Sequence, residues 1–209
     1  MMRLSILTRL ALGLTLLSGG AALAQEFSAD LINLAHADDP NHGTIYVSKD
    51  KMRFEGMQPA GHANMGAMVV DLAQHKTYVL MPERKMYVET DAAGAGPQRN
   101  MQFFSIGSSA DACSEWQKLT NRAEGTCKKV GAESLNGRNT TRYQVTSADG
   151  KVTDLWIDPS LHFPIKAKGS DSTGMELRNI KEGSQPASLF AIPADYQKLD
   201  MGGMIKRPQ

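Results

Sequence analysis

Four side chains of the kind that bind soft or borderline metal ions lie within one short segment. They are Met57, His62, Met65 and Met68. Thioether and imidazole ligands select Cu(I) among the common metal ions. The residues between them are rich in Gly and Ala, and the segment offers no identifiable residue that would hydrogen-bond the imidazole and orient it toward a metal. A solvated hairpin loop explains the segment equally well, so a Met/His copper site is an alternative hypothesis for this chain.

The chemistry of an enzyme has weaker support. The sequence contains no G-x-S-x-G motif, no H-E-x-x-H motif and no phosphate-binding loop. Asp154 and Asp158 would share one face of a strand, where paired carboxylates can act as acid and base. Asp158 is better explained as the residue that shapes the turn before Pro159 with its side chain. We therefore expect no catalytic residues and no cofactor.

The only two cysteines, Cys113 and Cys127, predict a disulfide. An even number of cysteines at a short spacing most simply forms a bond in an oxidising compartment. A redox or metal pair is the alternative, but the C-x-x-C spacing and a nearby His are missing. Residues 111–119, which include Cys113, show one of the few helical patterns in the chain.

The first residues predict export. Arg3 and Arg9 begin the chain, and the apolar stretch Leu10–Leu17 leads to the small residues Ala22–Ala24. A basic start, a short apolar core and an A-x-A motif are typical of a secretory signal peptide cleaved after Ala24. The apolar core is much shorter than the roughly 20 residues that span a bilayer. We expect residues 1–24 to be the signal peptide and the mature protein to be periplasmic.

The rest of the chain should form a single domain over residues 25–200, with a flexible tail at 201–209. Removing Arg3 and Arg9 from the 23 basic residues leaves 21, against 22 acidic ones. Such a balanced charge argues against nucleic acid, which requires a dense basic patch. It also argues against purely electrostatic attachment to a membrane, so we expect at most a transient, peripheral contact.

Short runs of β-branched, aromatic and Met residues separated by polar breaks predict an antiparallel sheet. In the first half these runs are residues 44–48, 51–55, 66–72, 76–81 and 85–89. In the second half they are residues 141–147, 152–157, 164–168 and 174–180, with Asp149-Gly150 as the strongest hairpin signal. The predicted fold is mainly β (α+β): a strongly curved antiparallel sheet, or half-open β-barrel, wrapped around one or two helices.

Part of this sheet should be apolar on both faces. The face that should look outward carries Tyr46, Met68, Val70, Tyr78 and Leu80, which alternate with neighbours that are equally apolar. An antiparallel sheet normally turns one face to water, so protein or a ligand must cover the second face. We interpret it as the wall of an apolar pocket, although core packing explains any single member better than ligand contact does. The candidate ligand-binding residues are Met52, Phe54, Met68, Val70, Tyr78, Leu80, Met86 and Trp156.

Several spaced patterns resemble the periplasmic lipoprotein-carrier superfamily, which sorts outer-membrane lipoproteins. The similar elements are the hairpin 43–55, the strand pair around residues 70–80, the strand-turn-strand 154–166 and the closing F-x-x-P-x-x-Y pattern within 189–196. The resemblance covers about residues 43–198. The chain differs from the dedicated carriers in its low aromatic content, 6%, and in its cysteine loop, so it resembles an uncharacterised branch.

This resemblance implies an unclosed β-barrel with a helical lid and a cavity for acyl chains. Arg53 is the counterpart of a functional arginine in that superfamily, but alternation directs it away from Met52 and Phe54. The predicted function is an exported carrier or sensor that binds an acyl lipid or lipoprotein. Its partners would be envelope transport or signalling proteins. The alternative function is a copper-binding envelope protein.

Overall fold

The computed structural model describes residues 26–39, 42–56, 66–91, 112–113, 125–147, 149–171 and 173–199. The described strands form a single 12-stranded sheet in the order β12-β6-β5-β4-β3-β2-β1-β11-β10-β9-β8-β7. The strands are β1 (Phe27–Asn33), β2 (Gly43–Val47), β3 (Lys51–Glu55), β4 (Ala67–Asp71), β5 (Lys76–Met81), β6 (Met86–Asp91), β7 (Thr126–Leu135), β8 (Arg138–Thr146), β9 (Val152–Asp158), β10 (Phe163–Gly169), β11 (Gly174–Glu182) and β12 (Gln197–Lys198).

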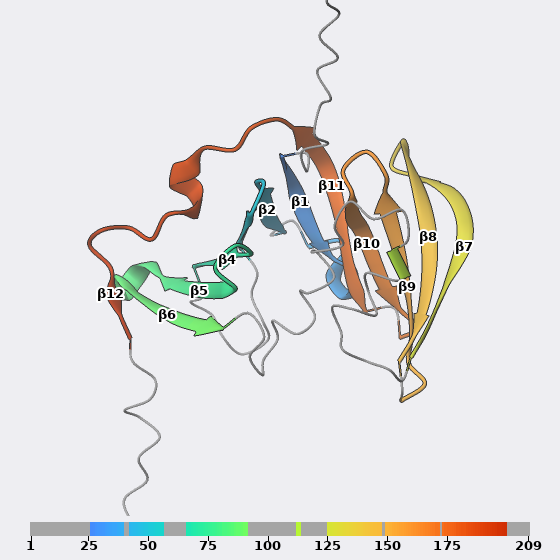
Figure 1. Cartoon of the computed structure of the whole chain (residues 1–209), viewed down its shortest axis with the longest axis horizontal. Coiled ribbons are helices and arrows are strands. Elements are labelled where there is room, and N and C mark those ends of the chain that lie inside the picture. Colours follow the sequence, from blue (N-terminus) through green and yellow to red (C-terminus); the bar gives the residue numbers. More distant parts are fainter. Residues whose placement is uncertain are drawn as a thin grey trace, which may run out of the picture.

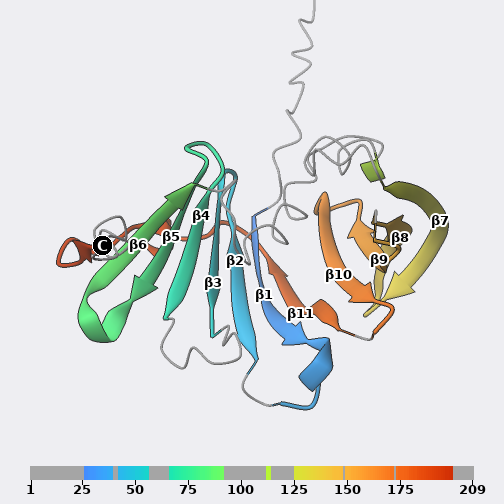
Figure 2. The same ribbon diagram turned by 90° about the horizontal axis from the view of Figure 1, so that it is seen from below.

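The sheet consists of two meanders joined in the middle. β1 pairs with β2 on one side and with β11 on the other, so the first and last long strands connect the two halves. All pairings among the described strands are antiparallel except that between β12 and β6. Figures 1 and 2 show that the sheet is strongly curved and that β7 lies far from β6 and β12. The predicted half-open antiparallel sheet is therefore confirmed.

The helices that this sheet was expected to enclose are not seen in the described part of the chain. Outside the strands, the described residues form short 3-10 helices: η1 (Leu34–His36), η2 (Pro82–Arg84) and η4 (Ala187–Phe190). The helix predicted within 111–119 lies outside the described residues except for Ala112 and Cys113, which are helical. Nothing described is both long and apolar enough to be a membrane-crossing helix.

Local chemistry explains the turns. Asp71, at the end of β4, accepts a hydrogen bond from the backbone nitrogen of Gln74 at 2.8 Å. This closes the predicted turn into β5. The Asp149-Gly150 hairpin between β8 and β9 is confirmed, with Gly150 at φ 79°. Strand β7 was not predicted. Its turn into β8 contains Asn136 and Gly137, both at positive φ, and an Asn-Gly pair is itself a hairpin signal.

Apolar side chains pack on both faces of the β2–β6 half. On the concave face a cluster of buried residues, called here the inner cluster, joins the two halves of the sheet. It comprises Phe27, Ala29, Leu31, Ile45, Val47, Met52, Phe54, Val70, Leu161, Phe163, Ile165 and Leu177. The Phe27 and Phe163 rings meet edge to face, with centroids 5.1 Å apart. The prediction of a sheet that is apolar on both faces is confirmed.

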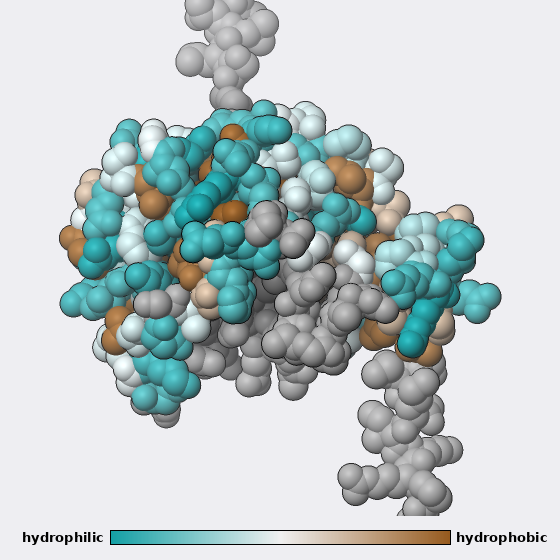
Figure 3. All heavy atoms as spheres, turned by 180° about the vertical axis from the view of Figure 1, so that it is seen from behind, coloured by the Kyte–Doolittle hydropathy of each residue, from teal (hydrophilic) through white to brown (hydrophobic). Residues whose placement is uncertain are grey.

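The convex face of the same half is covered by the C-terminal strap, defined as residues 184–199. Phe190 of the strap packs against Ala67, Val69 and Leu80. Figure 1 shows the strap running along the outside of the sheet from β11 to β12, on the side away from the concave face. Hydrophilic residues predominate among the described atoms on the side shown in Figure 3.

Candidate functional site

One cross-strand row on the concave face changes from fully buried to partly exposed along its length. Directly paired positions in an antiparallel sheet share a face, so the register defines the row. From β1 to β6 it contains Ala29, Ile45, Phe54, Met68, Val79 and Val88. Ile45 is 0% exposed and Phe54 is 1% exposed. Met68, Val79 and Val88 are only half-buried.

Met86 lies beside this row on β6, on the same face as Val88 and also half-buried. Together, Met68, Val79, Met86 and Val88 form what we call the inner apolar patch. It adjoins the inner cluster through the pair Phe54–Met68. The concave face therefore has an apolar surface whose β4–β6 end is less covered than its centre.

The register brings together five of the eight candidate ligand-binding residues. Met52, Phe54, Met68 and Val70 lie next to one another on the concave face of β3 and β4. The fifth, Met86, lies on the same face at β6.

The other three candidates lie elsewhere. Tyr78 and Leu80 were expected on the same face as Met68 and Val70, but the register pairs them with Val69 and Ala67, so they lie in the cluster under the strap, beside Phe190 on the convex face. Trp156 lies in the other half of the sheet, paired with Lys166.

Trp156 is surrounded by charges rather than by apolar side chains. Its ring nitrogen Nε1 donates a hydrogen bond to Glu133 Oε2 at 2.6 Å. The Arg142 guanidinium carbon lies 5.7 Å from the ring centroid, and Lys166 Nζ lies 5.3 Å from it. Two cation–π contacts and a charged acceptor hold the indole in place. This environment does not suit an acyl chain.

The cross-strand row through Trp156 and Lys166 continues to a buried carboxylate, Glu176, which no sequence pattern indicated. Glu176 is 4% exposed. Its carboxylate accepts hydrogen bonds from Lys166 Nζ and Arg178 Nε, each at 2.7 Å, and from Asn136 Nδ2 at 3.1 Å. Burial alone would raise the pKa of Glu176, but these donors outweigh it and lower the pKa to about 2. The group is therefore ionised at neutral pH.

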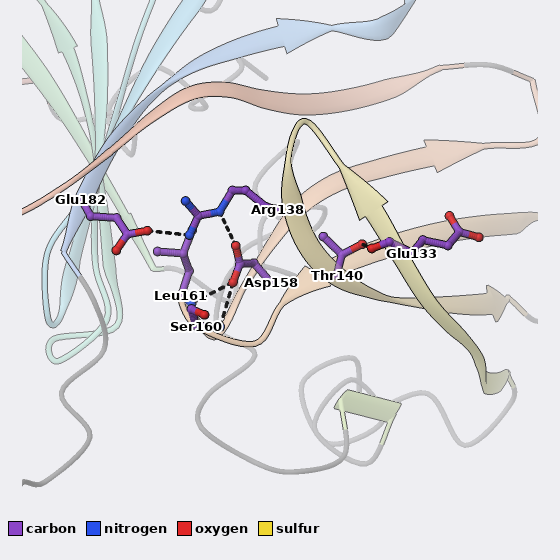
Figure 4. Close-up of polar contacts among 7 residues, drawn as sticks. All are labelled: Glu133, Arg138, Thr140, Asp158, Ser160, Leu161 and Glu182. Carbon is purple, nitrogen blue, oxygen red and sulfur yellow. Dashed lines mark hydrogen bonds and ion pairs between the residues drawn. The ribbon is translucent and has the colours of Figure 1, made fainter.

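Asp158 shapes the turn between β9 and β10, as predicted. Its Oδ1 accepts hydrogen bonds from the backbone nitrogens of Ser160 at 2.8 Å and Leu161 at 3.2 Å. Its Oδ2 is bound by Arg138, which also reaches Glu182 of β11 at 2.6 Å, as Figure 4 shows. The 2% exposed carboxylate thus holds the turn that carries Leu161 into the inner cluster. These contacts give Asp158 a structural role.

A pocket of about 370 Å³ opens on the convex side between the sheet and the strap. It is lined by Arg53, Glu55, Gly66, Ala67, Leu80, Pro82, Ser188, Leu189, Ala191, Pro193 and Tyr196. Arg53 Nε pairs with Glu55 at 2.6 Å, and Arg53 Nη1 donates to the carbonyl of Leu189 at 2.8 Å. Arg53 therefore faces away from Met52 and Phe54, as alternation predicted, and fastens the strap.

The predicted disulfide is present. Cys113 and Cys127 are bonded, with their Cα atoms 5.4 Å apart. The bond packs against a cluster that includes Tyr143, Val145 and Leu155. It attaches the segment at Cys113 to the start of β7.

The copper hypothesis is not tested by the structure. Met57, His62 and Met65 lie outside the described residues, and Met68 is part of the inner apolar patch. Within the part of the chain that the structure describes, no three His, Cys, Asp or Glu side chains form a group that could hold a metal ion.

Comparison with solved structures supports the observed fold. An uncharacterized conserved protein from Thermus thermophilus is 11% identical, with a TM-score of 0.54 over 85% of this chain and 91% of that chain. The structure of PNGF-II in space group P21 is 12% identical, with a TM-score of 0.52 over 87% of this chain. The match covers only 32% of the PNGF-II chain. At these identities the likeness concerns the fold alone.

A LolA superfamily protein from Nitrosomonas europaea is also among the structural neighbours. It is 12% identical, with a TM-score of 0.33 over 80% of this chain and 90% of that chain. A TM-score this low does not place the chain in that superfamily. A search of curated proteins by sequence finds no match. The model of the domain of unknown function DUF4412 matches residues 32–162, more than half of the chain, and the protein therefore belongs to the DUF4412 family.

Proposed function

We propose that the protein binds an apolar ligand, the acyl chain of a lipid or lipoprotein, on the concave face of its sheet. One observation carries the proposal: along a single cross-strand row, the side chains change from fully buried Ile45 and Phe54 to half-buried Met68, Val79 and Val88. The inner apolar patch would be the contact surface for the chain. The adjoining inner cluster would form its base.

The energetics of this surface suit an acyl chain. Burial of one methylene contributes about 0.8 kcal/mol, so several contacts are enough for useful affinity. Met68 and Met86 add flexible thioethers, which adapt to irregular apolar guests. The convex face of the same strands is already covered by the strap, through Phe190. The concave face is therefore the better location for a ligand.

In this proposal the protein works in the periplasm as a carrier or sensor. The signal-peptide pattern of the first 24 residues and the Cys113–Cys127 disulfide both favour an oxidising compartment outside the cytoplasm. A carrier would pass its ligand to an envelope transport protein, and a sensor would report it to a signalling protein. The same acyl-binding surface would serve either role.

The experiment is native mass spectrometry of the protein purified from its own compartment, followed by titration with palmitic acid. The test variant is Val88→Asp, which places a charge at the half-buried end of the inner apolar patch. We expect acyl adducts on the purified protein and at least about a tenfold loss of palmitate affinity in the variant, because a desolvated carboxylate opposes apolar contact.

The matched control is Ser188→Trp, which fills the pocket on the convex side and leaves the concave face unchanged. It should bind palmitate as the unmodified protein does. Loss of binding in Ser188→Trp but not in Val88→Asp would move the ligand to the convex pocket and refute the proposal. A protein that takes up no acyl chain but binds one copper ion, lost on His62→Ala, would instead support the copper alternative.

A further inference from the structure

Within the described residues, the outer edge of β6 is paired over only part of its length. β6 has six residues, Met86–Asp91, all of which pair with β5. On the opposite edge, among the described residues, it pairs only with the two residues of β12. This is also the one parallel pairing in the described sheet, at the end of the strap (Figure 1). β12 thus occupies about a third of the strand that it covers.

The backbone of β6 directs further hydrogen-bonding groups toward this edge. Gln197 N donates to the carbonyl of Lys85 at 2.9 Å, and Leu199 N donates to the carbonyl of Tyr87 at 2.8 Å. Outward and inward groups alternate along a strand, so those of Glu89 must point to the same side as those of Tyr87. Asp91 follows with the same orientation. The edge therefore continues as a row of donors and acceptors beyond β12.

The side chains along this edge differ in chemistry between the two faces. On the convex face the Glu89 carboxylate forms ion pairs with Lys198 Nζ at 2.8 Å and with Lys76 Nζ at 3.1 Å. Asp91 also forms an ion pair with Lys76 Nζ, at 2.9 Å, but its side chain remains 77% exposed. The concave face presents Met86 and Val88, followed by the small side chain of Thr90. A strand added here would meet carboxylates on one face and apolar side chains on the other.

β12 is held by contacts that can be exchanged. Both of its residues are exposed, and its ion pair Lys198–Glu89 lies at the surface, where such pairs contribute little. The main apolar anchor of the strap, Phe190, precedes β12 by several residues and packs on other strands. Tyr196, immediately before β12, is only partly buried in the same cluster, so β12 can leave β6 while Phe190 stays packed on the convex face.

We propose that the edge of β6 docks an extended polypeptide partner that takes the place of β12. The partner pairs with the backbone at Tyr87, Glu89 and Asp91. It carries alternating side chains, basic on the convex face and apolar on the concave face. Lys198, which already pairs with Glu89, is an internal example of the basic half of this pattern. Addition of a strand to a sheet edge is a common mode of peptide recognition. This inference does not depend on the proposed acyl ligand.

The experiment uses the full chain and two synthetic eight-residue peptides, one alternating Lys with Val and the other alternating Glu with Val. Calorimetry should show the Lys–Val peptide binding at least about tenfold more tightly than the Glu–Val peptide. Hydrogen exchange should show new protection at the amides of Glu89 and Asp91. Equal binding of both peptides, or protection confined to other strands, would overturn the proposal.

Two variants separate charge from backbone pairing. Asp91→Lys should lower the affinity for the Lys–Val peptide about fivefold, which corresponds to the loss of a good surface ion pair. Asp149→Lys changes an exposed carboxylate in a distant turn, so it should leave the affinity unchanged. Asp91→Pro removes the outward N–H at the end of an edge strand, a place where proline is tolerated. It should weaken both peptides. If Asp91→Lys and Asp149→Lys act alike, the binding is general charge attraction and the docking site is refuted.

Discussion

Replacing Glu176 by Gln should destabilise the protein at neutral pH but not in strong acid. The carboxylate is 4% exposed and is bound by Lys166, Arg178 and Asn136. These contacts lower the pKa of Glu176 from 4.5 to about 2. A shift of one unit corresponds to about 1.4 kcal/mol, so the ionised form contributes about 3 kcal/mol to the free energy of unfolding.

The sign of the pH effect follows from the direction of the shift. Because the pKa is lower in the folded state than in the unfolded state, the contribution is complete above pH 4.5. It is lost as the pH falls from 4.5 toward 2, where the folded protein also takes up the proton. Glu176→Gln removes this dependence. The stability difference between the unmodified protein and the variant should therefore be about 3 kcal/mol at pH 7 and should close toward pH 2.

Urea unfolding of both proteins at pH 7, 4.5, 3 and 2 measures this difference. Asp149→Asn provides a matched control, because hydrogen bonds from Ser147 and Lys151 also lower the pKa of Asp149 to about 2. Asp149 lies in an exposed turn, with 56% of its side chain accessible, so solvent screens its interactions. Its substitution should change the stability little at any pH. A Glu176→Gln deficit that stays constant with pH, or an equal deficit in Asp149→Asn, would refute the reasoning.

Three further substitutions test the packing. Replacing Cys113 and Cys127 together by Ser should cost about 3 kcal/mol and lower the Tm by roughly 6–12 °C, measured by calorimetry under non-reducing conditions, because the unfolded chain loses a loop constraint. Phe190→Ala should cost about 3 kcal/mol in urea unfolding, since it removes the main apolar anchor of the strap; a cost near zero would show that the strap is not fastened there. Gly174→Ala should lower the free energy of unfolding by about 3 kcal/mol, because a Cβ would clash with the backbone of β10. Gly183 is also at positive φ, but no described atom lies within 4 Å of where its Cβ would be, so Gly183→Ala should cost only about 1 kcal/mol. Equal costs at the two glycines would contradict the clash.

Much of the fold could be predicted because its signals are local. Strand positions in β2–β6 follow from alternating β-branched and aromatic residues, and the turn at Asp149-Gly150 follows from its dipeptide. The opposite directions of Phe54 and Arg53 follow from the two-residue period of a strand. The disulfide follows from there being only two cysteines.

The candidate site was predicted only in part. Alternation within each strand predicted correctly that both faces are apolar, but it wrongly grouped Tyr78 and Leu80 on the same face as Met68. Face assignment across strands depends on register, which is set by pairing between segments. The position of Trp156 among Glu133, Arg142 and Lys166 depends on the same long-range pairing.

By itself, then, the sequence determined an antiparallel sheet that is apolar on both faces, because the strand period and the turn residues are signals confined to a few neighbouring positions. Tertiary structure decided which of the two apolar faces is already covered. That decision depends on contacts between segments far apart in the chain, such as the hydrogen bond from Arg53 to Leu189 across 136 positions. The packing of Phe190 on β4 and β5 has the same origin. Such contacts form only when the sheet has assembled, because Phe190 and Arg53 contact a surface that no single strand provides.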